Sequence, residues 1–127
     1  MAISRDEVLM GRDKKYPLTP EMEQNLQKLL VALNKFRQIY GKSMVVSSGY
    51  RPAAINANVP GAAKKSAHMS CEACDFRDTD GSLDKYCMDN LYILEQCGLY
   101  LEHPSATPGW CHLQIRRPGS GNRVFKP

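Results

Sequence analysis

The sequence predicts an α+β domain in which a small, mainly antiparallel sheet packs with two main helices. Apolar residues recur at helical spacing over residues 20–40 and 82–96. Four short apolar runs separated by turn residues predict strands. The length of 127 residues suits one domain with its own core. We therefore expect a single domain over 1–127, with an N-terminal extension at 1–18 and a basic C-terminal tail at 116–127.

The first helix has clear start and stop signals. Residues 1–18 are polar, and we expect them to be irregular. Thr19 followed by Pro20 is typical of a helix start, because a hydroxyl caps the first turn and proline fits the first helical position. Gly41 supplies the stop. The apolar stripe of this helix consists of Met22, Leu26, Leu29, Leu30, Leu33 and Phe36.

The remaining elements alternate between short strands and one further helix. Residues 52–66 are rich in Ala, Pro and Gly and predict an ordered loop. The second helix is expected over 82–96 and ends at Gly98, while Val124-Phe125 is a candidate edge strand. The four main strands are expected at residues 44–47, 73–76, 99–102 and 110–115.

Charge and hydropathy exclude some classes of partner. The net charge of +4 is too small to indicate nucleic acid, although it suits an anionic polymer such as a cell wall. No apolar run is long enough to cross a bilayer, so we expect no stable membrane insertion. Arg5, Asp6 and Glu7 precede any apolar stretch, so we expect synthesis in the cytoplasm without a signal peptide.

Five cysteines are an odd number, so at least one is unpaired, and we expect mainly buried free thiols. One alternative joins His68 to Cys71 and Cys74 in a structural zinc site. Cys74 and Asp75 would point to opposite faces of a strand, so both cannot bind one metal. The cysteines are Cys71, Cys74, Cys87, Cys97 and Cys111.

Two segments carry groups suited to metal chemistry. Residues 66–75 contain His68 and Asp75, and the later run Trp110-Cys111-His112 adds a second imidazole. Two imidazoles and one carboxylate can hold a catalytic zinc and leave a position for water. From these residues alone, structural histidines and a turn-capping Asp75 remain alternatives.

The order and spacing of these motifs resemble a family of zinc peptidases that act on cell-wall stem peptides. The motifs are Ser48-Gly49-Tyr50-Arg51, then Ser66-x-His68 with Ala73 and Asp75, and finally Trp110-x-His112. The family groups D-alanyl-D-alanine carboxypeptidases and dipeptidases, the VanX and VanY types, with phage L-alanyl-D-glutamate endolysins, and it shares the Hedgehog-like fold. The resemblance covers roughly residues 20 to 115.

The resemblance implies a zinc site and a substrate site. Zinc would be held by His68, Asp75 and His112. Arg51 would bind a carboxylate or carbonyl of the substrate, since a guanidinium can form two parallel hydrogen bonds to a carboxylate. A surface arginine is the alternative. The residues expected to contact the stem peptide are Arg51, Ser66 and Trp110, with a turn-forming serine as the alternative for Ser66.

The sequence departs from the family pattern at two positions. Cys71 stands where the family has glycine, and Gly109 stands where the family usually has its catalytic acid, three residues before the last histidine. Glu102 is the best substitute as the catalytic base. In a hairpin with Glu102 opposite Trp110, its side chain would share a face with His112. A shift of one residue would turn it to the other face.

The expected function is that of a zinc peptidase, a carboxypeptidase or an endopeptidase, which hydrolyses a peptide bond in peptidoglycan. The resemblance suggests a phage-encoded endolysin or a virion-associated lysin that reaches the cell wall after release, and we expect a monomer. The alternative is a catalytically inactive phage structural or cell-wall-binding protein, which Gly109 favours.

Overall fold

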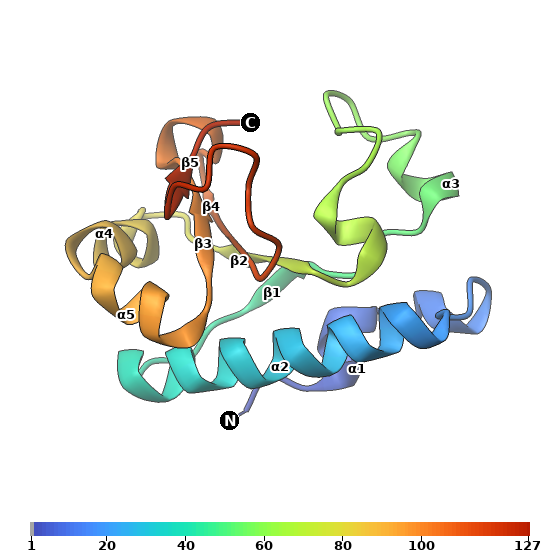
Figure 1. The fold of residues 1–127 in the computed structure, drawn as a ribbon, viewed down its shortest axis with the longest axis horizontal. Helices are drawn as coiled ribbons and strands as arrows, with labels where there is room; N and C mark the ends of the chain where they lie inside the picture. The colour runs from blue at the N-terminus through green and yellow to red at the C-terminus, as the bar shows by residue number, and fades with distance from the viewer. Residues whose placement is uncertain (1) are drawn as a thin grey trace.

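A five-stranded sheet forms the centre of the structure, a computed structural model that describes residues 2–127 (Figure 1). The strand order is β1-β2-β4-β3-β5, and every neighbouring pair is antiparallel except β3 and β5. The predicted α+β class with a mainly antiparallel sheet is confirmed. The strands are β1 (Val46–Ser48), β2 (Ala73–Arg77), β3 (Tyr100–Glu102), β4 (Trp110–Gln114) and β5 (Val124–Phe125).

The longest helix, α2, covers Pro20–Tyr40, as its start and stop signals predict. The Thr19 hydroxyl accepts a hydrogen bond from the Met22 amide, and Gly41 ends the helix in the left-handed conformation. Within residues 2–127, no helix has the length and apolar character that a bilayer span requires. The other helices are α1 (Arg5–Leu9), α3 (Ala53–Asn56), α4 (Ser82–Asp89) and α5 (Leu91–Cys97), with 3-10 turns η1 (Arg12–Lys14), η2 (Ala67–Ser70) and η3 (Pro104–Ala106).

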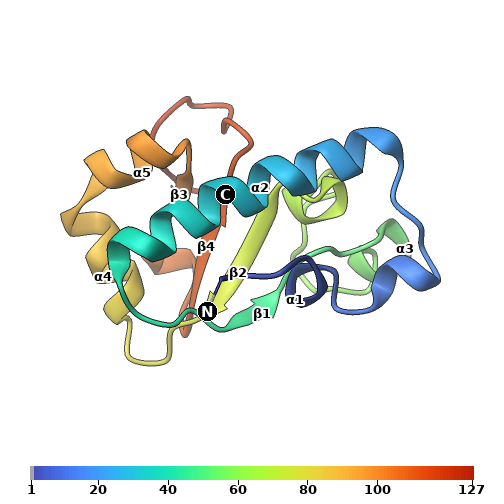
Figure 2. The same ribbon diagram turned by 90° about the horizontal axis from the view of Figure 1, so that it is seen from below.

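One face of the sheet is covered by α2, which lies below the strands in Figure 1 and passes across β2 and β4 in Figure 2. Cys74 and Phe76 of β2 belong to the same buried cluster as the apolar stripe of α2. Since side chains alternate along a strand, Asp75 points to the other face. The same alternation on β4 buries Cys111 and Leu113. The second face of β2 and β4 is therefore the one available for a polar site.

The N-terminal prediction was wrong for residues 5–14, which form α1 and η1 rather than irregular chain. Ser4 and Glu7 form a reciprocal capping box that starts α1. Val8 and Leu9 then enter the core, where their side chains are 0% and 2% exposed. This segment therefore contributes to the core.

Three further boundaries differ from the predicted ones. The helix expected over 82–96 is broken at Asn90, whose φ of -136° is not helical, so it becomes α4 and α5. The first strand starts at Val46 rather than at residue 44, and its register with β2 shifts before Ser48. The loop 52–66 contains the short helix α3. The expected edge strand Val124-Phe125 is confirmed as β5.

Candidate metal centre

Three of the sequence-predicted residues meet on the face of the sheet away from α2. Asp75 on β2 and His112 on β4 are directly paired across the strands. His68 reaches them from η2, and one ligand atom from each of the three residues lies within 4.8 Å of the others. Asp75 Oδ1 is 2.8 Å from His112 Nδ1, and Asp75 Oδ2 is 3.2 Å from His68 Nε2. The carboxylate thus lies between the two rings.

His68 is positioned by backbone contacts on both sides of its turn. The Ser66 hydroxyl accepts a hydrogen bond from the His68 amide and caps η2, while Cys71 ends the turn at φ 62°. On the other side, the Arg51 amide donates to the His68 carbonyl. The ring nitrogen Nδ1 lies 2.8 Å from the Gly49 carbonyl. Gly49 itself touches α1, because a Cβ atom there would lie 2.1 Å from the Val8 carbonyl oxygen.

His68 and His112 favour the ionised form of the Asp75 carboxyl group. Burial would raise the pKa of Asp75, but contacts with His112 and His68 outweigh burial and hold this pKa well below its ordinary value. Burial would lower the pKa of His112, but Asp75 outweighs that effect and raises it. Both shifts have one cause, the close contact between the Asp75 carboxylate and the imidazole rings.

The donor set fits a divalent metal. The Gly49 carbonyl can only accept a hydrogen bond, so Nδ1 of His68 carries the hydrogen. In the neutral ring the lone pair is then on Nε2, the atom that faces Asp75. Such an outer partner is what orients metal-binding histidines in general. Two imidazoles and one carboxylate match the three protein ligands of a catalytic zinc.

Glu102 lies beside this group, although its register differs from the predicted one. β3 and β4 pair Tyr100 with Gln114, so Glu102 is level with His112 and not with Trp110. The shift is two residues, which keeps the side chain on the same face. Glu102 Oε1 is 3.9 Å from His112 Nδ1. Burial raises the pKa of the Glu102 carboxyl.

The group opens into a cavity of about 620 Å³ that also receives the other predicted residues. Arg51 donates a hydrogen bond from Nη2 to the Ser66 hydroxyl at 3.3 Å, while its buried Nε has no partner. Burial lowers the pKa of Arg51. Trp110 lies on the cavity wall, but Gly109 does not line it. All the sequence-predicted site residues line it: Arg51, Ser66, His68, Asp75, Glu102, Trp110 and His112.

Several residues that sequence reasoning did not assign to the site also lie there. Gln114 Oε1 is 2.7 Å from His112 Nε2, and the Phe125 ring is 6.1 Å from the His112 ring. Arg116 lines the same cavity. Gln114 follows His112 by two residues, so the alternation of side chains along a strand predicts that both lie on the same face of the sheet. Nothing in the sequence indicates that β5 returns beside β3.

The alternative zinc site built on cysteines is not assembled. Among residues 2–127, the cysteine sulfurs join no group of ligands close enough to share a metal. Cys71 and Cys74 are both buried in the core on the α2 side. Burial raises the pKa of Cys71 to about 12 and that of Cys74 well above its ordinary value, which disfavours the thiolate that a metal needs. All five thiols are buried and unpaired.

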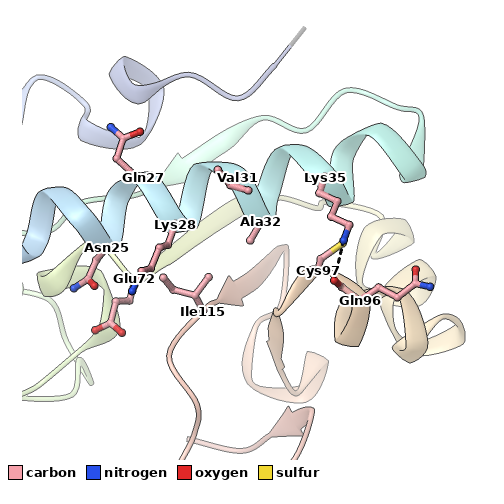
Figure 3. Close-up of a pocket in the computed structure, with 10 residues that line it drawn as sticks. All are labelled: Asn25, Gln27, Lys28, Val31, Ala32, Lys35, Glu72, Gln96, Cys97 and Ile115. Carbon is pink, nitrogen blue, oxygen red and sulfur yellow. Dashed lines mark hydrogen bonds between the residues drawn. The ribbon is translucent and has the colours of Figure 1, made fainter.

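A second cavity, of about 630 Å³, lies between α2 and the end of α5 and contains none of the predicted site residues (Figure 3). Its lining is mixed, with Val31, Ala32 and Ile115 beside lysine and amide side chains. At the α5 end of the cavity, the Lys35 ammonium donates to the Gln96 carbonyl at 3.1 Å. Nothing here resembles a catalytic group of residues.

Comparison with known proteins places the chain in a family. A model of the family described as Peptidase M15 matches residues 3–97, which is more than half of the chain and includes His68 and Asp75. His112 and Glu102 follow the matched segment. No curated protein and no solved structure gives a match. The chain therefore belongs to the Peptidase M15 family, zinc peptidases that act on peptidoglycan.

Proposed function

We propose that this protein hydrolyses a peptide bond in peptidoglycan stem peptides, with zinc held by His68, Asp75 and His112. The convergence of these three donors within 4.8 Å, in a cavity that also holds Glu102 and Arg51, is the observation that carries the proposal. Family membership supports the peptidase activity.

The proposed ligand atoms are Nε2 of His68, Nδ1 of His112 and the carboxylate of Asp75. Three protein ligands leave a position for water or substrate. When bound, zinc supplies a Lewis acid that polarises the scissile carbonyl and lowers the pKa of water. The low pKa of Asp75 keeps that ligand ionised at neutral pH.

Glu102 is proposed as the base that takes the proton from the attacking water and returns it to the departing amine. Its carboxylate lies on the side of the sheet where His112 Nδ1 faces Asp75, at 3.9 Å from that nitrogen. The raised pKa of Glu102 makes the carboxylate a stronger base than an exposed one. This role fits a chain that has Gly109 where the family usually carries its acid.

Arg51 is proposed to bind a carboxylate or carbonyl of the stem peptide. Arg51 lines the cavity, and its buried Nε lacks a hydrogen-bond partner. The contact with Ser66 holds the guanidinium in place. Ser66 and Trp110 would complete the substrate wall, with the indole offering an apolar surface to an alanine methyl group.

A sharp test combines metal analysis with digestion of purified peptidoglycan. The wild-type protein should bind about one zinc per chain and release peptide fragments. His112→Ala should lose both properties, while His103→Ala, which alters a half-buried histidine outside the cavity, should keep both. Glu102→Gln should keep the zinc and lower turnover by about 100-fold. Zinc retained in full by His112→Ala would overturn the metal site.

The same digest decides the narrower assignments. Mass spectrometry distinguishes cleavage between D-alanines from cleavage between L-alanine and D-glutamate, and removal of one terminal residue from an internal cut. We propose a phage-encoded lysin as the narrower assignment, because the family that the motifs resemble includes phage endolysins. Activity on intact cell walls would support it, and activity on free dipeptide alone would contradict it.

A second candidate is a cell-wall-binding protein without turnover, which Gly109 at the usual acid position favours. Such a protein would bind peptidoglycan in a pull-down and retain zinc, yet release no fragments. Binding of peptidoglycan by both wild type and Glu102→Gln, with no fragments released by either, would select this candidate.

A further inference from the structure

We propose that Gln114 is a positioning residue that orients His112 so that Nδ1, and not Nε2, binds the metal. This inference rests on the metal site proposed above and concerns a residue outside the ligand set. Gln114 lies on β4 two residues after His112 and on the same face of the sheet. Its side chain is buried, at 6% exposure, so water cannot replace its partners freely.

The amide of Gln114 can be oriented in one way only. Gln114 Nε2 lies 2.8 Å from the Arg116 carbonyl oxygen, and a backbone carbonyl can only accept a hydrogen bond. The NH₂ group therefore faces Arg116, and Oε1 faces the ring of His112. Oε1 is 2.7 Å from His112 Nε2, so Nε2 must carry the hydrogen. In the neutral ring the lone pair is then on Nδ1, which lies 2.8 Å from Asp75 Oδ1.

The Arg116 carbonyl is itself held by contacts of its own side chain. The guanidinium donates to the Lys65 carbonyl, to the Ser70 hydroxyl at 2.7 Å and to Glu72 at 2.9 Å. These partners belong to the segment that carries His68. The orientation of one ligand, through Gln114, is therefore tied to the segment that supplies another.

The two histidines differ in what their outer nitrogen touches. For His68 that partner is the backbone carbonyl of Gly49, which no substitution of a side chain removes. For His112 it is the side chain of Gln114, so the contact can be deleted without touching a ligand. Loss of such an outer partner typically weakens metal affinity by about 10–100-fold.

The experiment measures zinc affinity by competition with a chelator of known affinity. Gln114→Met, which matches the length of glutamine without an acceptor, should bind zinc about 10–100-fold more weakly than wild type. Gln114→Glu should recover only part of the affinity, because one carboxylate oxygen can accept the same hydrogen bond while the other lacks a hydrogen to donate to the Arg116 carbonyl. Gln96→Met, at an exposed position on α5, should leave affinity unchanged (Figure 3).

A second readout reports the ring directly. Long-range ¹H–¹⁵N spectra of the zinc-loaded wild-type protein should show His112 with its hydrogen on Nε2. In Gln114→Met this hydrogen should exchange faster with water. Equal zinc affinity of wild type and Gln114→Met, or a hydrogen on Nδ1 of His112 in the loaded wild type, would overturn the role of Gln114 alone. Failure of the wild type to bind zinc would overturn the metal site and this inference with it.

Discussion

Arg116 and Glu72 join the two segments that carry the histidines. The Arg116 guanidinium donates from Nε and Nη2 to one oxygen of Glu72, at 3.1 and 2.9 Å. Glu72 lies between His68 and Asp75 in the sequence, and Arg116 follows His112 at the end of β4. The backbone adds a further bond, from the Ile115 amide to the Glu72 carbonyl. The spacing between the proposed ligands is therefore supported from outside the proposed metal site.

Glu72→Gln should lower the free energy of unfolding by about 1–2 kcal/mol, since it removes the charge from a partly buried hydrogen-bonded pair. Urea unfolding measures this difference. Glu95→Gln, at an exposed position of α5, is the control and should change stability by less than about 0.5 kcal/mol. Equal stabilities of the two variants would show that the Arg116 contact contributes nothing measurable.

Arg51→Lys should weaken substrate binding while leaving zinc content unchanged. An ammonium cannot reproduce two parallel hydrogen bonds to a carboxylate. We expect kcat/KM on a stem peptide to fall by about 10-fold or more, the equivalent of one charged hydrogen bond. An unchanged kcat/KM would return Arg51 to a structural role, that of holding Ser66.

Cys71→Gly should be more stable than Cys71→Ala, although glycine is the smaller residue. Cys71 has a φ of 62°, a conformation that costs residues with a side chain about 1 kcal/mol or more. Both variants lose the buried sulfur, and only glycine also removes the strain. We expect a difference of about 1 kcal/mol in unfolding free energy. Equal unfolding free energies of Cys71→Ala and Cys71→Gly would mean that the left-handed conformation at residue 71 carries no strain.

Asp84 should make stability depend on pH. It is buried on α4, its Oδ1 has no partner, and burial together with the nearby Asp78 raises its pKa to about 6. A carboxyl whose folded-state pKa is raised favours folding while protonated. This contribution is present below the unfolded value near 4 and is lost as the pH rises through about 6.

Asp84→Asn should therefore stabilise the protein relative to wild type by about 1–3 kcal/mol more at pH 8 than at pH 4. Unfolding in urea at the two pH values gives the comparison. Asp89→Asn, which removes an exposed carboxylate from the same helix, is the control variant for the comparison. If the unfolding free energies of wild type and Asp84→Asn differed by the same amount at both pH values, Asp84 would not be the source of the pH dependence.

The sequence predicted well what depends on local signals. α2 begins after Thr19 and ends at Gly41, because capping and the left-handed turn are properties of a few adjacent residues. The family resemblance implied that Asp75 and His112 lie at one metal site, and the structure pairs the two residues across β2 and β4. α1 was missed although Ser4 and Glu7 form a capping box, since so short a helix persists only through packing of its apolar residues.

Other features depend on contacts that no local pattern encodes. The β3–β4 register is determined by how the connection through η3 turns, so the sequence alone could determine neither the partner of Glu102 nor its face of the sheet. The contact of Gln114 with the Arg116 carbonyl depends on the path of the chain after β4. Distances between side chains from separate segments, such as His68 and Asp75, require the folded structure.

Gly49 connects the candidate metal centre to the N-terminal helix α1. The Gly49 carbonyl contacts the His68 ring, while the next amide, of Tyr50, donates to the Val8 carbonyl at 2.8 Å. Detachment of α1 would therefore free the peptide that orients His68, so the two regions should open as one cooperative unit. Amide hydrogens of α1, remote from the ligands in sequence, should consequently exchange more slowly with deuterium once zinc is bound.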